Sequence, residues 1–133
     1  MKRELFLQSP FFLFNRLSLN TKAIIPALLW FIVTTILLCI PGKKLPSISW
    51  FHIYQIDKLV HISIFLVLSF LFCRAISNKK WFFLVALFCS FYGMIMEFVQ
   101  ENYIPNRSFD FWDIVADTIG SFGVFILLNL KKK

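Results

Sequence analysis

Carboxyl groups gather near the end of the chain, where residues 96–120 read MEFVQENYIPNRSFDFWDIVADTIG. This stretch holds five acidic side chains and Arg107, and an earlier segment adds Asp57, Lys58 and His61. Paired carboxylates bind amines or hard divalent cations through oxygen, and a neighbouring imidazole can act as a general acid or base. These residue types therefore suit either head-group recognition or metal-assisted catalysis.

The spacing of these residues matches the faces of helices. Side chains three or four residues apart lie on one side of a helix, and the polar residues here repeat at those intervals. The residues grouped in this way are Asp57 with His61, Glu97 with Gln100 and Glu101, and Asp113 with Asp117. We therefore expect three helices, each carrying one polar face.

The composition indicates an integral membrane protein. The chain has 133 residues, of which 59% are hydrophobic and only 16% are charged, and its mean hydropathy is +0.74. A soluble domain of this size needs more polar residues to cover its surface. The apolar residues also fall in long blocks, which does not fit a soluble core.

Four apolar blocks reach the length of roughly 20 residues that a helix needs to cross a bilayer. They are residues 23–41, 58–76, 81–99 and 112–130. Residues 1–22 mix basic and aromatic side chains and are expected to lie along the membrane interface, and residues 131–133 form a basic tail. The sequence thus predicts an all-α integral membrane protein. Its single domain, residues 23–130, is a four-transmembrane-helix bundle that follows a short N-terminal interfacial segment.

The distribution of Lys and Arg predicts the orientation of these spans. Ten of the 14 basic residues lie before the first block, at the end of the second block or between it and the third, or after the fourth. The positive-inside rule then places both termini in the cytoplasm. The formal charge of +7 is explained by this topology and by contact with anionic lipids. The expected partners are therefore membrane lipids and not nucleic acid.

Six of the seven acidic residues fall at the opposite, outer side of this topology: Asp57, Glu97, Glu101, Asp110, Asp113 and Asp117. Carboxylates at membrane depth are costly when they face lipid, so we expect them to converge inside the bundle. Like charges 4 Å apart repel by about 1 to 4 kcal/mol. Arg107, Lys58, a protonated His61 or a bound cation can offset this repulsion. Arg107 is the strongest candidate because a guanidinium group can bridge two carboxylates.

Each feature also has a purely structural interpretation. Asp57, Asp110 and Asp113 lie where helices are expected to begin, and an acid at that position caps the helix. Glu97 and Asp117 lie away from the first turn of a helix, and an ionisable residue inside a membrane points to function. The sequence therefore favours a functional cluster, with a structural cluster as the alternative.

Three ordered motifs resemble the VanZ-like family of small bacterial membrane proteins. They are DKLVH at the start of the second block, EFVQ at the end of the third, and PNRSFDFWD before the fourth. The matching residues are Asp57, Lys58, His61, Glu97, Gln100, Pro105, Arg107, Asp110, Asp113 and Gly120. The family usually has Asn where this chain has Asp117, so the role of that amide does not carry over. The resemblance implies a multi-pass protein of the bacterial cytoplasmic membrane and a link to teicoplanin resistance, but no particular reaction.

Two functions of different kinds remain open. The first is binding of the head group of a lipid, a lipid-linked peptidoglycan precursor or a glycopeptide-type antibiotic, by residues Asp57, Lys58, His61, Glu97, Gln100, Arg107, Asp110, Asp113 and Asp117. The second is a membrane-embedded enzyme that acts on a lipid head group, with a divalent metal as its cofactor. Its catalytic candidates are His61, Asp113 and Glu97, and its metal-ligand candidates are Asp113, Asp117, Glu97 and Asp57. A transporter is disfavoured because the cytoplasmic halves of the spans carry no acid.

Overall fold

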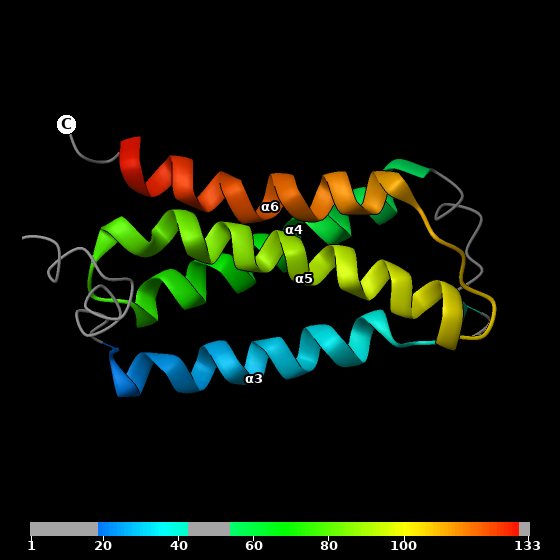
Figure 1. The fold of residues 1–133 in the computed structure, drawn as a ribbon, viewed down its shortest axis with the longest axis horizontal. Coiled ribbons are helices and arrows are strands. Elements are labelled where there is room, and N and C mark those ends of the chain that lie inside the picture. Colours follow the sequence, from blue (N-terminus) through cyan, green and yellow to red (C-terminus); the bar gives the residue numbers. More distant parts are fainter. Residues whose placement is uncertain (1–18, 43–53, 131–133) are drawn as a thin grey trace, which may run out of the picture.

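Four long helices run side by side and alternate in direction (Figure 1). The computed structural model describes residues 19–42 and 54–130. Its helices are α3 (Thr21–Leu38), α4 (Tyr54–Ala75), α5 (Phe82–Tyr103) and α6 (Phe111–Leu130), with a short 3₁₀ helix, η3 (Lys79–Trp81), before α5. The described residues form no strand, only an isolated bridge between Leu19 and Ile76. The prediction of an all-helical bundle of four long helices is thereby confirmed.

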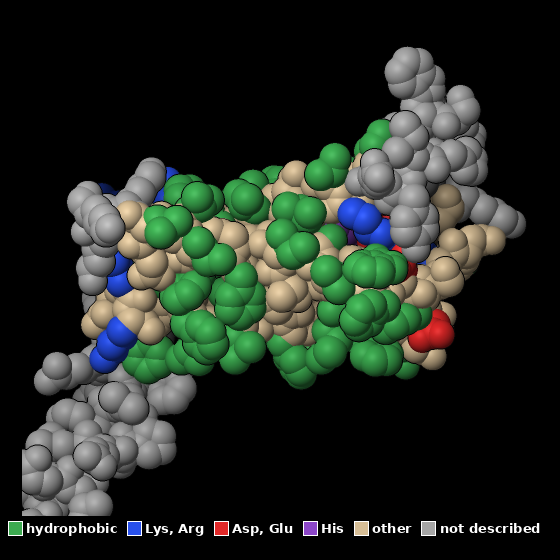
Figure 2. Space-filling view, turned by 90° about the horizontal axis from the view of Figure 1, so that it is seen from above, with side chains coloured by type: hydrophobic (Ala, Val, Ile, Leu, Met, Phe, Trp, Pro, Cys, Tyr) green, Lys and Arg blue, Asp and Glu red, His purple; other side chains and the backbone are tan. Residues whose placement is uncertain are grey.

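All four helices are long and apolar enough to cross a membrane, with mean hydropathies of 2.0, 2.0, 2.0 and 1.6 in chain order. Large apolar side chains such as Ile25, Leu29, Phe91 and Leu127 lie exposed on the outside of the bundle. Figure 2 shows hydrophobic side chains covering the middle of the visible face. A surface of this kind is typical of helices that face lipid.

Three predicted boundaries differ from the helix ends by three or four residues. The second predicted span begins at residue 58, but α4 begins at Tyr54. The first predicted span continues to residue 41, but α3 ends at Leu38, because Ile40 precedes Pro41 and is thereby disfavoured from a helical conformation. The third predicted span stops at residue 99, but α5 continues to Tyr103. The structure describes residues 19–22 of the predicted interfacial segment, and α3 already begins at Thr21. The rest of that segment and the tail at residues 131–133 lie outside the described residues.

Helix α6 packs against both α4 and α5, whereas α3 packs mainly against α4. The core of the bundle is apolar and includes Phe65, Leu68 and Cys89. Two glycines allow the closest approaches. A side chain at Gly120 would collide with the Ile62 carbonyl on α4, and one at Gly93 would collide with the side chain of Asp117 on α6. Small residues allow helices to pack closely in this way.

The chain after α3 is tied to the loop between α5 and α6. The Gln100 side-chain amide donates a hydrogen bond to the Leu38 carbonyl at 2.8 Å, and the Gly42 amide donates to the Pro105 carbonyl at 3.2 Å. Asn106 has a φ of 60° in this loop, a conformation that Asn tolerates better than most residues. These contacts fix the loop that leads into α6.

Candidate functional site

The end of α5 and the starts of α4 and α6 lie together at one end of the bundle (Figure 1). Charged and polar side chains meet there. We call this group the polar cluster and the end where it lies the cluster end. Its members are Asp57, Lys58 and His61 of α4, Glu97 and Gln100 of α5, Asp110 before α6, and Asp113 and Asp117 of α6. Five of them are buried: His61, Glu97, Gln100, Asp113 and Asp117. Five of the six acidic residues that were expected to converge therefore do so, and Glu101 is the exception.

Lys58 links α4 to α6 through two ion pairs. Its ammonium group donates to Asp110 Oδ2 at 2.5 Å and also to Asp113 Oδ1, and it lies 3.7 Å from Asp57 Oδ2. The Lys58 side chain is only 16% exposed. Removing one partner of a buried ion pair costs about 3–5 kcal/mol, because the remaining charge is left uncompensated. Lys58 is therefore central to the electrostatics of the polar cluster.

The expectation that Arg107 bridges two carboxylates was wrong. Among the described residues, its Nε donates to the Ile40 carbonyl oxygen at 3.4 Å and no carboxylate lies within ion-pair distance of it. Arg107 belongs to the loop that is tied to the chain after α3, whereas Lys58 lies on α4 opposite α6. Lys58, and not Arg107, therefore bridges the acidic side chains, because only Lys58 lies next to them in the fold.

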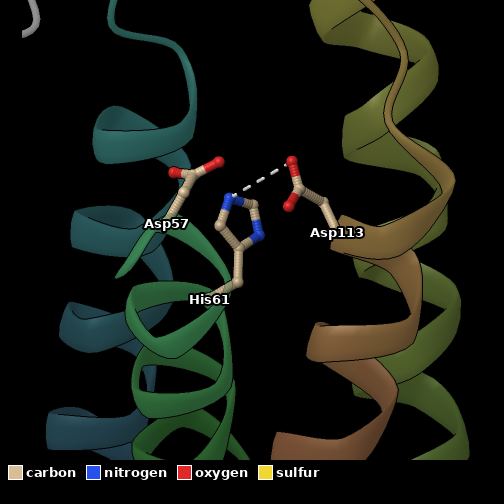
Figure 3. A group of neighbouring side chains, drawn as sticks. All are labelled: Asp57, His61 and Asp113. Carbon is tan, nitrogen blue, oxygen red and sulfur yellow. Dashed lines mark ion pairs between the residues drawn. The ribbon is translucent and has the colours of Figure 1, made fainter. Parts of the chain in front are cut away.

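His61 and Asp117 form a buried pair. The Nδ1 atom of His61 lies 2.8 Å from Asp117 Oδ1, and the two residues are 3% and 1% exposed. When Asp117 is ionised, its carboxylate only accepts hydrogen bonds, and Nδ1 of His61 is then the donor in this pair. The other ring nitrogen, Nε2, lies 3.9 Å from Asp113 Oδ2. Figure 3 shows the His61 ring between Asp57 and Asp113.

Glu97 anchors the start of α6 from the side of α5. Its Oε2 atom accepts a hydrogen bond from the backbone amide of Asp110 at 3.0 Å, and the residue is 1% exposed. Glu101, expected on the same face as Glu97, is exposed instead. The face of α5 that is buried at this level includes Glu97 and Gln100 but not Glu101.

The capping interpretation holds for Asp110 but not for Asp57. Asp110 Oδ1 accepts a hydrogen bond from the Trp112 amide at 2.8 Å, as a residue that caps the start of a helix does. Helix α4 begins at Tyr54, so Asp57 lies inside the first turn, and its side chain is half exposed. Asp113 lies in the first turn of α6. Asp110 thus has a structural role in addition to its ion pair with Lys58.

An apolar groove of about 600 Å³ lies beside the polar cluster, between α4 and α6. Its lining residues are Lys58, Leu59, Ile62, Trp112, Val115, Ala116 and Ile119. Lys58 therefore belongs both to the groove and to the polar cluster. The sequence analysis missed this groove, because its shape depends on how α4 and α6 pack against each other and no motif encodes that packing.

Three of the side chains lie close enough together to share a cation. Asp57, His61 and Asp113 each offer one ligand atom, and these atoms lie within 4.8 Å of one another. Two of the expected metal ligands have other partners: Glu97 binds the Asp110 amide and Asp117 binds His61. The arrangement brings Asp57 and Asp113 together as expected and adds His61 to them.

The polar cluster can therefore hold a cationic group, orient an imidazole and place both beside an apolar groove. These capabilities follow from the positions of Lys58, His61 and the carboxylates around them. Comparisons with protein families, curated proteins and solved structures found no match to this chain.

Proposed function

We propose that this chain is a VanZ-like protein of the bacterial cytoplasmic membrane that binds the amine-bearing head group of a membrane amphiphile at the outer side of the bilayer. The amphiphile is a lipid, a lipid-linked cell-wall precursor or a glycopeptide-type antibiotic. One observation carries the proposal: a buried cluster rich in carboxyl groups adjoins an apolar groove between α4 and α6, two of the three helices that form the cluster.

The groove and the polar cluster together match the two parts of an amphiphile. The groove is lined almost entirely by apolar side chains and offers about 600 Å³, which suits an acyl or isoprenoid chain. Lys58 lines the groove and contacts Asp110 and Asp113. A chain lying in the groove therefore places its polar head beside the carboxylates.

The charge balance favours a positively charged head group. In the described part of the chain, the polar cluster holds five carboxyl groups (Asp57, Glu97, Asp110, Asp113 and Asp117) and one ammonium group. That ammonium group, on Lys58, is already bound by two carboxylates, which disfavours a phosphate at the same place. An amine instead offsets the repulsion between the acids.

Basic residues at the opposite end of the bundle support the outward orientation of the polar cluster. Lys22, Arg74, Lys79 and Lys80 lie at the start of α3, the end of α4 and within η3. We call this the basic end. Under the positive-inside rule the basic end faces the cytoplasm, and the cluster end faces outward.

The resemblance to the VanZ-like family supports a role in the cell envelope. The motif residues Asp57, Lys58 and His61 lie beside Asp110 and Asp113 of the third motif, and Glu97 of the second motif contacts Asp110. The three motifs thus meet in one place, as expected if they form one binding site. Teicoplanin and related amphiphilic glycopeptides are therefore ligands to test.

Asp113→Asn tests this function, with Glu101→Gln as the matched control because Glu101 is an exposed acid outside the polar cluster. Each variant is produced in a bacterium that lacks the protein, and both its membrane abundance and the teicoplanin susceptibility of the cells are measured. Because Lys58 keeps its ion pair with Asp110 in Asp113→Asn, we expect this variant to reach the membrane but to abolish any protection, while Glu101→Gln retains it. Loss of protection that always parallels loss of protein would instead indicate a purely structural cluster.

The His61–Asp117 pair favours a second candidate, a membrane-embedded enzyme acting on a lipid head group. An ionised Asp117, 2.8 Å from Nδ1, would hold the proton on that nitrogen and leave Nε2 to accept a proton from a nucleophilic water, as a general base does. The test is product release from a panel of lipid phosphates and esters by the purified protein with divalent metal. Turnover lost in His61→Gln supports the enzyme, and no turnover on any substrate rules against it.

A further inference from the structure

We infer that Asp57, His61 and Asp113 form a binding site for one divalent transition-metal ion such as Mn²⁺ or Zn²⁺. One ligand atom from each residue lies within 4.8 Å of the other two. Asp57 and His61 are four residues apart on α4, and Asp113 faces them from α6 (Figure 3). The three ligands thus come from two helices that Lys58 already joins.

The orientation of the buried His61 side chain indicates a metal site, which a group of carboxylates alone would not. The residue is 3% exposed, and its Nδ1 is held by Asp117 Oδ1 at 2.8 Å. Metal-binding histidines commonly donate their second N–H to a carboxylate in this way, which fixes the ring and raises its basicity. The lone pair of Nε2 is then directed toward Asp57 and Asp113.

The separation between the ligand atoms also fits a cation. Nε2 lies 3.9 Å from Asp113 Oδ2, too far for a hydrogen bond between them. Metal–nitrogen and metal–oxygen bonds of about 2.0–2.2 Å allow one ion to bridge a gap of about 4 Å. A mixed set of one imidazole and two carboxylates suits Mn²⁺ and Zn²⁺ better than Ca²⁺, which prefers oxygen ligands.

Lys58 is the internal competitor for this site. Its ammonium group binds the Oδ1 atom of Asp113, while Oδ2 of the same carboxylate faces His61. The two oxygens of Asp113 can therefore hold Lys58 and a metal ion at once, but the two positive charges repel each other. Asp57, which is half exposed, offers the route by which the ion enters.

Three protein ligands leave coordination positions open for water or for a ligand oxygen. This inference thus extends the proposed function by adding a cation at the same site, which would let the cluster also take phosphate-bearing head groups. Metal binding itself is independent of any head group.

The test is a titration of the purified protein with Mn²⁺ in maltoside detergent without added lipid, followed by electron paramagnetic resonance. We expect one saturable Mn²⁺ site per chain, with nitrogen coupling from His61 in the electron spin-echo spectrum. Asp57→Asn and His61→Gln should weaken binding at least tenfold, and Asp117→Asn by about 10- to 100-fold because it removes the charge that orients His61. Glu101→Gln is the control and should bind as the parent protein does.

Two further variants help to distinguish failure of the metal site from failure of the proposed function. Lys58→Met should strengthen Mn²⁺ binding if the ion and the ammonium group compete. Asp57→Asn keeps the test informative if the His61 variant does not fold, because Asp57 is half exposed. Absence of saturable binding, or binding without nitrogen coupling, would overturn the metal site and leave the proposal of amine binding untouched. Conversely, Mn²⁺ binding by a protein that binds no amphiphile would contradict only the proposed function.

Discussion

At the scale of single residues, Lys58 is the side chain that balances the polar cluster. Its ammonium group lies between Asp110 and Asp113 and close to Asp57. The flexible stem of lysine lets this charge reach from α4 to α6. Without it, Asp110 and Asp113 would lose the ammonium group that they share across the contact between α4 and α6.

Lys58→Met should therefore destabilise the protein by about 3–5 kcal/mol, because Asp110 and Asp113 lose a partner they share. Unfolding in detergent measures this effect. Lys79→Met, an exposed change at the basic end, is the control and should alter stability by at most about 0.5 kcal/mol. Replacing Lys58 together with both aspartates by neutral residues should recover much of the loss, and no recovery would contradict the ion-pair explanation.

Two substitutions of Asp117 test how much its hydrogen bond with His61 contributes to stability. Asp117→Asn keeps a side-chain oxygen that can accept the Nδ1–H bond, so we expect stability near that of the parent protein. Asp117→Leu leaves the buried N–H without a partner and should cost about 1–3 kcal/mol. The same unfolding measurement compares the two variants, and equal stability for both would show that the hydrogen bond contributes little.

The spacing of residues predicted which helix faces carry acids, but not which cation balances them. Intervals of four residues placed Asp57 with His61 and Asp113 with Asp117 because a helix has a fixed period. The choice of Lys58 over Arg107 depends on how the loop before α6 is tied to the chain after α3, which is a tertiary contact. The exposure of Glu101 likewise depends on the rotation of α5 against its neighbours.

At the scale of helices, close contact between α4 and α6 brings the halves of the polar cluster together. Gly120 lies against the Ile62 carbonyl of α4, one turn further into the bundle than Asp117. Gly120 is also among the residues that resemble the VanZ-like family. The close approach that it permits explains why a small residue is needed there.

Gly120→Ala should therefore separate α4 from α6 and cost about 1–3 kcal/mol, the usual cost of overpacking. Gly123→Ala is the matched control on the same helix, because a side chain there meets open space. It should be neutral or stabilise α6 by up to about 1 kcal/mol, because alanine favours a helix more than glycine does. Thermal unfolding of the two variants in one detergent makes the comparison, and an equal effect of both would contradict close packing at Gly120.

The existence of the four helices was predictable from sequence because each is a long apolar block. Their ends were less so. Pro41 explains the early end of α3. Helix α5 continues through the polar residues 100–103, and the Gln100 side chain in this extension bonds to the Leu38 carbonyl. That contact joins residues far apart in the chain, so no local pattern reveals it.

At the scale of the whole molecule, the two ends of the bundle differ in charge. In Figure 2 the left end shows Lys and Arg side chains without acidic ones, whereas the acidic side chains that are visible lie at the right end, where Lys or Arg is also present. The proposed orientation predicts that the loop before α6 faces outward. This orientation can be predicted from the lengths of the apolar blocks and from the uneven distribution of Lys and Arg between the loops, because neither depends on tertiary contacts.

The orientation of the bundle in the membrane can be tested by introducing one cysteine at a time. The native Cys39, Cys73 and Cys89, which are all free thiols, are first replaced. Ser108 and Ser77 are exposed at opposite ends of the bundle. A membrane-impermeant thiol reagent applied to intact cells should label Ser108→Cys, and should label Ser77→Cys only after the membrane is opened. The reverse pattern would place the polar cluster in the cytoplasm.

Binding of a charged amphiphile is the central claim, and head-group selectivity measures it most directly. Photoreactive amphiphiles that share one alkyl chain but end in an amine, a phosphate or a hydroxyl group are offered to the protein in metal-free nanodiscs. We predict that the amine probe labels residues that line the groove, such as Trp112 and Ile119. This labelling should fall at least tenfold in Asp113→Asn but persist in Glu101→Gln. Equal labelling by all three probes, or labelling unaffected by Asp113→Asn, would contradict the proposal that the carboxylates of the polar cluster bind the head group.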